Sequence, residues 1–540
     1  MIRRIRWQML IAACAALVVI GLLGSVALST SATTLSLTGA VYVEGVVGAP
    51  RQLNPLAQGP DASPAERDLA ALLLEGLTRV GVDGRIEPAL AERWTVSQDG
   101  RVYTFRLRAG RTWHDGALVT ADDVLYTVRG VQNANFPGDP ALAALWRNVL
   151  VQKQDERTVQ FQLSAPFAPF PSVARLPILP AHLFRTLRPE QWPTASWTQH
   201  PVGTGRYKLY ALDAQQAVLV PFAGYPGTPA LDHLVLRFYP TAEAAVLGLS
   251  RREVQGVATV ATGGQRLPDV PRRAQRLLAP LGDYTILAFN LQQSPLDELQ
   301  LRRALVLGLN REVLITKVLG GQGQLLDTPV LPGTWAAEPA ARLPAFRRSA
   351  AQQQLGALGY VDTNGDGWVE ADGQRLVLPL LIADAVEANA VAAELAQQLR
   401  EIGIGLDIQR VPSSELQTAL ASHNFTMALH SWSDVGVDPD LYALWHSSRA
   451  DGGANYAGLR DAQIDQLLMD GRAAQDEPTR RQIYADFQRR WVELIPSLPL
   501  YQNVLAYDVE GAPAPPVPPD LLSNRVERFA VLDEWLQPNQ

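Results

Sequence analysis

The residues best suited to hold a small charged or extended ligand lie in the segment 429–440, which reads LHSWSDVGVDPD. Trp432 offers an aromatic surface at the end of an expected strand, and Ser433, Asp434 and Asp438 add polar groups where Gly and Pro free the backbone. An extended peptide can be held by main-chain hydrogen bonds while a carboxylate meets its ammonium terminus. These four residues are therefore predicted to contact substrate. A second interpretation, compatible with the first, places Trp432 in the core and makes Asp438 the cap of the next helix.

Catalytic and metal chemistry have little support in the sequence. Neither GxSxG nor HExxH occurs, so a secreted peptidase lacks its nucleophile or metal set. The run 362–367 has the early positions of a calcium loop, DxNxDG, but Gly373 stands where the bidentate carboxylate belongs. We interpret this run as a β-turn hairpin. The sequence thus predicts no catalytic residue, no metal and no cofactor.

Composition indicates an exported globular protein. The 540 residues are 47% hydrophobic and 19% charged, which is typical of a folded chain with several domains. A basic segment, an apolar run at 9–28 and small polar residues at 29–34 describe an export signal. Residues 1–34 are either a cleaved signal peptide or a retained membrane anchor, since the run is also about long enough to span a bilayer. Lipidation at Cys14, the single cysteine, is a third possibility.

The net charge argues against nucleic acid as a partner. The formal charge is −7, and it becomes −10 without the leader arginines Arg3, Arg4 and Arg6. A nucleic-acid surface requires an excess of cations.

The most specific local pattern is the segment 94–129. A turn at 98–100 leads into 102–107, where residue types alternate as in a strand with two different faces. A second tight turn, WHDG, precedes Thr120 and Asp123, whose spacing predicts a capping box and a following helix.

This order of FRLR, W.DG and T.DDV resembles the signature of the family 5 extracytoplasmic solute-binding proteins of ABC importers, the peptide and nickel group. LNPL at 53–56, GTGRY at 203–207 and LPLY at 498–501 resemble further family motifs, with Arg206 where Pro is usual. The resemblance implies a two-lobed α/β periplasmic-binding-protein-like fold of type II, or cluster C. It would have an additional domain, mixed sheets flanked by helices, and a ligand cleft between the lobes.

The resemblance also implies where the chain crosses between lobes. Crossings are expected near 201–207 and near Asn290, and the strand through Tyr501 is expected to return to the first lobe, so both residues are predicted substrate contacts. Strands are expected at 231–239 and 285–291. Alternating helices and strands are expected at 350–358, 376–382, 388–402, 405–411 and 427–432, which implies βαβ units, and two amphipathic helices at 461–471 and 477–494. The implied division is lobe I at 38–76, 190–288 and 495–540, an extra domain at 77–189, and lobe II at 289–494.

The implied function is capture of a peptide and its delivery to an ABC permease with its ATPase, by a monomer at the periplasmic or extracellular face of the membrane. Two departures bear on the ligand. Val435 stands where the family has an Asp that pairs with the substrate amine, and 378–390 lacks the Arg of dipeptide binders. We therefore expect oligopeptides rather than dipeptides. The alternatives are a sugar or nickel chelate on the same fold, or a membrane-tethered peptide sensor.

Overall fold

The computed structural model describes residues 39–59, 62–81, 83–227, 231–260, 269–433, 435–510 and 521–531. The expected leader, 1–34, and the candidate contact Asp434 therefore lie outside the described residues. Within the described part of the chain, no helix is both long and apolar enough to cross a membrane.

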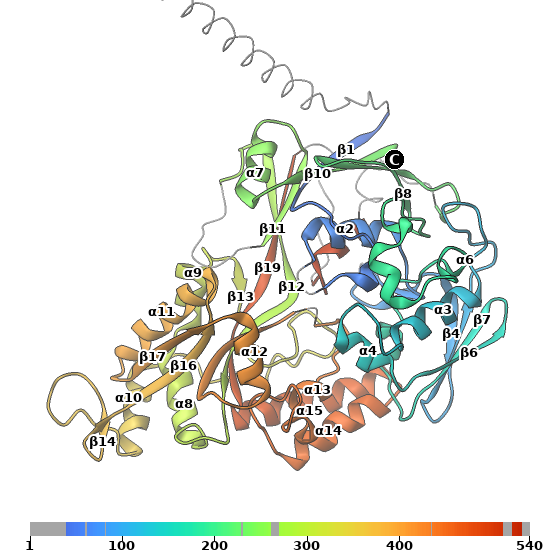
Figure 1. Ribbon diagram of the computed structural model, residues 1–540. Coiled ribbons are helices and arrows are strands. Elements are labelled where there is room, and N and C mark those ends of the chain that lie inside the picture. The colour runs from blue at the N-terminus through green and yellow to red at the C-terminus, as the bar shows by residue number, and fades with distance from the viewer. Residues whose placement is uncertain are drawn as a thin grey trace, which may run out of the picture.

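A mixed sheet of eleven strands runs through the molecule and joins its two halves (Figure 1). The half that carries the N-terminal strand is called lobe I below, and the half that carries the strands at 377–432 is called lobe II. In spatial order the strands are β17 (Gly405–Val411), β16 (Val377–Ala383), β18 (Met427–Trp432), β12 (Ala274–Phe289), β19 (Ser497–Glu510), β11 (Gly256–Val260), β1 (Val41–Val47), β10 (His233–Tyr239), β9 (Gln216–Pro221) and β8 (Tyr207–Leu212), with β13 (Gly323–Gln324) beside β19.

The long antiparallel strands β12 and β19 connect the lobes. The sequence predicts a strand only at 285–291, whereas β12 begins at Ala274. Its Arg276 donates two hydrogen bonds to Asp508 on β19, at 2.7 and 2.8 Å. The charge of Arg276, which interrupts the apolar pattern of β12, is thus paired with that of Asp508 on the neighbouring strand. β19 is buried along nearly its whole length, as expected of a strand covered on both faces.

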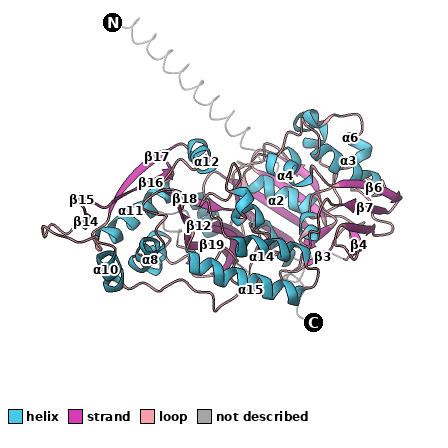
Figure 2. Cartoon of the chain, turned by 90° about the horizontal axis from the view of Figure 1, so that it is seen from below, coloured by secondary structure: helices cyan, strands magenta, loops and turns pink. Residues whose placement is uncertain are grey.

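Helices cover the lobe II end of this sheet. β16, α11 (Val386–Arg400) and β17 form the predicted βαβ unit, because the two strands are parallel neighbours. α11 buries Val391, Leu395 and Leu399 at helical spacing. The other helices of this lobe are α8 (Leu299–Gly308), α9 (Arg311–Val318), α10 (Arg348–Ala357), α12 (Ser413–Ala421), α13 (Tyr442–Trp445), α14 (Ala462–Ala473) and α15 (Glu477–Leu494). Figure 2 shows α8, α10 and α11 gathered at this end of the molecule.

A separate antiparallel sheet of four strands forms the additional domain at the opposite end (Figure 2). It is built from β4 (Ala91–Val96), β5 (Val102–Leu107), β7 (Thr158–Gln162) and β6 (Leu150–Asp155), with α3 (Ala121–Val131) against it. β5 alternates in burial as predicted, with Tyr103, Phe105 and Leu107 inward. The expected capping box is confirmed, since the backbone N–H of Thr120 donates to Asp123 at 2.8 Å.

One buried guanidinium anchors the C-terminal 3-10 helix η5 (Arg525–Val531) in lobe I. Arg528 donates to Glu44 on β1 at 2.6 and 2.8 Å. It also donates to Asp68 on α2 (Pro64–Leu73) at 2.6 and 2.9 Å. Its side chain is only 1% exposed. Three distant parts of the chain are thereby tied together.

The structure confirms the expected fold class. It is a two-lobed α/β protein with mixed sheets flanked by helices and an additional domain. The residue boundaries proposed for the lobes and for the extra domain stay predictions.

Candidate functional site

A cavity of about 1390 Å³ lies between the two lobes. On the lobe I side it is lined by the end of α2, by β2 (Thr78–Val80), by the short helix α5 (Phe170–Val173) and by part of the crossing 201–207. On the lobe II side it is lined by the loop after β18. Pro55 and Leu56 of the LNPL motif also contribute. The cavity is therefore built from segments that are far apart in the chain.

The predicted contact residues divide into two groups. Trp432, Ser433 and Asp438 line the cavity. Asn290 and Tyr501 are fully buried and are not among the residues that line it. Their assignment as ligand contacts stays a prediction.

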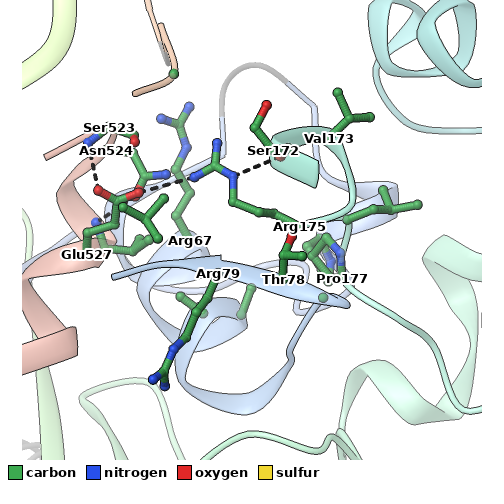
Figure 3. A pocket seen from close by; sticks show the side chains of 18 of the residues that line it. Arg67, Thr78, Arg79, Ser172, Val173, Arg175, Pro177, Ser523, Asn524 and Glu527 are labelled. Carbon is green, nitrogen blue, oxygen red and sulfur yellow. Dashed lines mark hydrogen bonds and ion pairs between the residues drawn. The ribbon is translucent and has the colours of Figure 1, made fainter. Parts of the chain in front are cut away.

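An ion pair between the extra domain and the C-terminal segment forms part of the cavity wall (Figure 3). Arg175 lies 3.2 Å from the Glu527 carboxylate and donates to the carbonyl of Ser172 at 3.0 Å. Glu527 also accepts a hydrogen bond from the backbone N–H of Ser523 at 2.7 Å. Burial raises the pKa of Glu527, against the opposing effect of Arg175. Arg67 lines the cavity next to this pair.

Trp432 presents an aromatic surface to the cavity. It stacks on Tyr456 with ring centroids 5.3 Å apart and planes 10° apart, and His430 meets it edge-on at 4.5 Å. The indole is only half-buried, and its Nε1 finds no hydrogen-bond partner among the described residues. The Nε1 atom is itself buried, so the surface that the indole offers to the cavity is its ring, which Tyr456 and His430 hold in place.

Asp438 lines the cavity but already holds a cation. Arg480 on α15 donates to its two carboxylate oxygens at 2.5 and 2.9 Å, and the guanidinium lies 4.9 Å from the Trp335 ring centroid. Burial raises the pKa of Asp438, and Arg480 opposes that rise. The alternative role as a helix cap is wrong, because α13 receives no side-chain cap; the carboxylate turns to Arg480 instead.

A neighbouring ion pair of lobe II lies where this lobe contacts the extra domain. Arg472 donates to Asp440 at 2.5 and 2.7 Å, and its guanidinium lies 5.1 Å from the ring of Phe167, in the extra domain. The backbone N–H of Ala168 donates to the carbonyl of Arg472 at 2.7 Å. These contacts join the two sides of the cleft along one rim.

Asn290 and Tyr501 connect the main sheet to its surroundings, Asn290 to the loop before β18 and Tyr501 to α11. The Asn290 amide donates to the carbonyls of His423 and Phe425 at 2.9 and 2.8 Å. The Tyr501 hydroxyl donates to Glu387 at 2.6 Å. Both polar groups are engaged within the protein.

The crossing at 201–207 is fixed by His114 of the WHDG turn. The N–H of Gly203 donates to its Nδ1 at 3.1 Å, and its Nε2 lies 3.0 Å from the carbonyl oxygen of Gly205. Because Nδ1 accepts, Nε2 carries the proton and the ring is neutral. Burial lowers the pKa of His114 to about 4. A neutral histidine thus ties the extra domain to the crossing.

This histidine makes stability depend on pH. The unfolded chain binds the proton near pH 6.5, whereas the folded chain binds it near pH 4. Stability is therefore complete above about pH 6.5 and falls as the pH drops toward 4. We expect His114→Asn to reduce that fall by about 1–3 kcal/mol, measured as Tm between pH 7 and pH 4.5. The control is His200→Asn, at an exposed position, which should show the same fall in Tm between pH 7 and pH 4.5 as wild type. If H114N also shows the wild-type fall, the role given to His114 is wrong.

No metal site is found in the part of the chain that the structure describes, where no group of three or more His, Cys, Asp or Glu is placed to hold an ion. The run 362–367 precedes the short hairpin β14 (Glu370–Ala371) and β15 (Gln374–Arg375). Asp362 accepts hydrogen bonds from two backbone N–H groups within that run. The run itself is a turn enclosed by a single antiparallel bridge between Val361 and Glu370, and the two-stranded hairpin expected here lies just after it, at 370–375.

Several residues at the site were not singled out from the sequence. The partners Arg480 and Arg472 follow their carboxylates by 42 and 32 positions, and no local pattern connects them. Arg206, Tyr225 and Glu75 also line the cavity. Of these three residues, only Arg206 was noticeable in the sequence, because it stands where the family motif usually has Pro.

The comparisons with known proteins agree with this geometry. Residues 85–454 match the family model described as "Bacterial extracellular solute-binding proteins, family 5 Middle". The chain belongs to this family. Family 5 proteins are extracytoplasmic solute-binding components of ABC importers and not enzymes.

Relatives within family 5 differ in what their names say they bind. The oligopeptide-binding protein AppA of Bacillus subtilis is 26% identical over 479 residues, which are 86% of each chain. The dipeptide-binding protein of Escherichia coli is 24% identical over 502 residues, 86% of this chain and 90% of that one. Their names do not decide between long and short peptides.

Solved structures of family 5 proteins share the fold. NikA from Brucella suis, in complex with Fe(III)-EDTA, matches with a TM-score of 0.75 at 22% identity, covering 91% of this chain and 99% of that one. AppA from Bacillus subtilis, in complex with a nonapeptide, matches with a TM-score of 0.68 at 23% identity, covering 91% and 98%.

Proposed function

We propose that this protein captures oligopeptides outside the cytoplasm and delivers them to an ABC permease driven by an ATPase. The observation that carries the proposal is the cavity between the lobes. Drug-sized ligands occupy roughly 300–1,000 Å³, and this cavity of about 1390 Å³ has room for more than a dipeptide. Relatives named for oligopeptide binding support the same interpretation.

The missing arginine also favours longer peptides. The segment 378–390, from β16 to α11, contains no Arg or Lys, and none of its residues line the cavity. A dipeptide binder of this family would hold the peptide amine with an Asp at position 435 and the peptide carboxylate with an Arg in the segment 378–390. This chain has neither residue. A longer peptide is held mainly by its backbone along the cleft.

The proposal includes the delivery path. Residues 1–34 would export the chain, as a cleaved signal or as an anchor at the membrane surface, and the monomer would close by rotation of its lobes about β12 and β19. Two alternatives remain. The ligand could be a sugar or a nickel chelate, or the protein could be a membrane-tethered sensor that does not import its ligand.

The deciding experiment is native mass spectrometry of the protein purified gently from its own host. Denaturation then releases whatever the cleft retains. Peptides of several residues are the expected result. A single sugar or metal chelate would overturn the peptide assignment while leaving the transport class intact.

Trp432 is expected to be the main apolar anchor. Trp432→Ala removes the half-buried ring that lines the cavity, and central aromatic anchors contribute about 2 kcal/mol or more. We expect Kd for the retained peptides to rise at least about 30-fold, measured by isothermal titration calorimetry. Tyr210→Ala is the control, because this residue of β8 is 60% exposed and does not line the cavity. Equal affinity in both variants would exclude Trp432 as a contact.

A further inference from the structure

The short helix α4 (Pro140–Trp146) of the extra domain is fixed at both ends. Gly138, just before it, lies so close to the LNPL loop that a Cβ would be 2.4 Å from the carbonyl oxygen of Leu56, and only glycine allows this approach. At the other end, the Trp146 side chain is 1% exposed and packs edge-on against Phe161, with ring centroids 5.8 Å apart. The helix is therefore held rigidly beside a loop that lines the cavity.

α4 presents apolar side chains to the cavity between the lobes. Leu142 and Leu145 both line it, and residues at this spacing are neighbours on a helix surface. Leu142 is half-buried, whereas Leu145 is 45% exposed. The helix contains no charged residue. Leu145 is thus a large apolar side chain that lies open to the cavity and is not packed into the core.

A second apolar contribution comes from α5, the other short helix of the extra domain at the cavity. Its Val173 lines the cavity and is half-buried, and α5 contains no charged residue either. In Figure 3, Val173 lies on the side of α5 away from the ion pair between Arg175 and Glu527. The extra domain therefore supplies an apolar part of the cavity wall that is separate from this charged part.

The lobe II side of the cavity also has an apolar part, which comes from α13. Ala443 is exposed and Leu444 is half-buried, and both line the cavity. The carboxylate that precedes this helix, Asp440, is bonded to Arg472. Apolar side chains of α4 and α13 thus line one cavity from its two sides. Apolar surface of this kind gains free energy when an apolar group of a ligand displaces the water on it.

We propose that Leu142 and Leu145 form an apolar subsite for one large apolar side chain of the ligand. The inference rests on the proposed function, because it takes the ligand to be a peptide. A leucine or phenylalanine side chain that enters this subsite is removed from water and gains the free energy of apolar burial. An alanine side chain buries less area, and a carboxylate would lose its hydration without gaining a partner. The protein therefore selects peptides by an apolar residue at one position.

The test is calorimetry with the full-length chain and a set of synthetic tetrapeptides. Four of them carry a single phenylalanine, at each position in turn, in an alanine background, and tetraalanine is the reference. Wild type is expected to bind one of the four at least about 10-fold more tightly than tetraalanine. Glutamate in place of that phenylalanine should abolish the gain, because the subsite offers its charge no partner.

Two substitutions of Leu145 then test the subsite. Leu145→Ala should bring the preferred phenylalanine peptide and tetraalanine within about 3-fold of each other. Leu145→Lys should reverse the preference, so that the glutamate peptide binds more tightly than the phenylalanine peptide. A side chain that only supported the fold would not cause this reversal. Both variants should keep a Tm close to that of wild type, because Leu145 is 45% exposed.

Leu150→Ala is the matched control. This residue of β6 belongs to the same extra domain and is 51% exposed, but it does not line the cavity, so the variant should keep the wild-type preference. If wild type binds all the tetrapeptides equally, or if L145A keeps the wild-type preference, the apolar subsite is wrong and the peptide proposal stands. If wild type binds none of them, the peptide proposal is wrong and the subsite falls with it.

Discussion

Replacing Arg528 by methionine is expected to lower the free energy of unfolding by about 3–5 kcal/mol, the cost of breaking a buried ion pair from one side. The two carboxylates that Arg528 holds, on Glu44 and Asp68, are both 0% exposed. Without the guanidinium they remain desolvated and repel each other. Arg525 would still lie 3.7 Å from Asp68, but among the described residues no ion pair joins it to Glu44, whose charge would then be left uncompensated.

The measurement is urea unfolding followed by circular dichroism, with an exposed ion pair as the matched control. Arg460→Met removes the partner of Asp451, and these side chains are 53% and 79% exposed. That change should cost less than about 1 kcal/mol. Adding Glu44→Gln and Asp68→Asn to R528M should restore part of the loss by removing the unpaired charges. Equal destabilisation by R528M and R460M would show that the buried cluster has no special role.

The elements that sequence reasoning predicted well are those specified by neighbouring residues. β17, β18 and α15 lie where the patterns placed them, because alternation and helical spacing act over a few positions. The hairpin and helix of the 94–129 segment follow from turns and a capping box in the same way. β12 was predicted too short, since Arg276 interrupts its apolar run and its partner Asp508 is 232 positions away.

The site was only partly predictable for a related reason. Trp432 could be placed at the cavity, because a strand end and a Gly-Pro loop are visible in the sequence. The ion pair of Asp438 could not be predicted from the sequence, because its partner Arg480 lies on a helix 42 positions later. Pairing partners across a fold are decided by tertiary packing, and no local spacing encodes them.

Asp438→Asn is expected to cost stability rather than affinity. The substitution keeps the shape of the side chain but removes the charge that satisfies Arg480, whose side chain is 7% exposed. A buried cation that has lost its counter-ion costs about 3–5 kcal/mol. The guanidinium would keep its hydrogen bond to the carbonyl of Gly471 at 3.0 Å and its contact with Trp335. We expect the lower half of this range for that reason.

Affinity measured on the same variant then decides what Asp438 does. At a temperature where D438N is fully folded, Kd for the peptides that wild type retains should stay within about 3-fold of wild type. Both carboxylate oxygens are already bonded to Arg480, so a ligand ammonium would have to compete with a fixed bidentate pair. A rise in Kd of 10-fold or more with an unchanged Tm would mean that Asp438 contacts the ligand directly. The pair with Arg480 would then have to open on binding, and Arg480→Met, by freeing the carboxylate, should bind cationic peptides more tightly than wild type does.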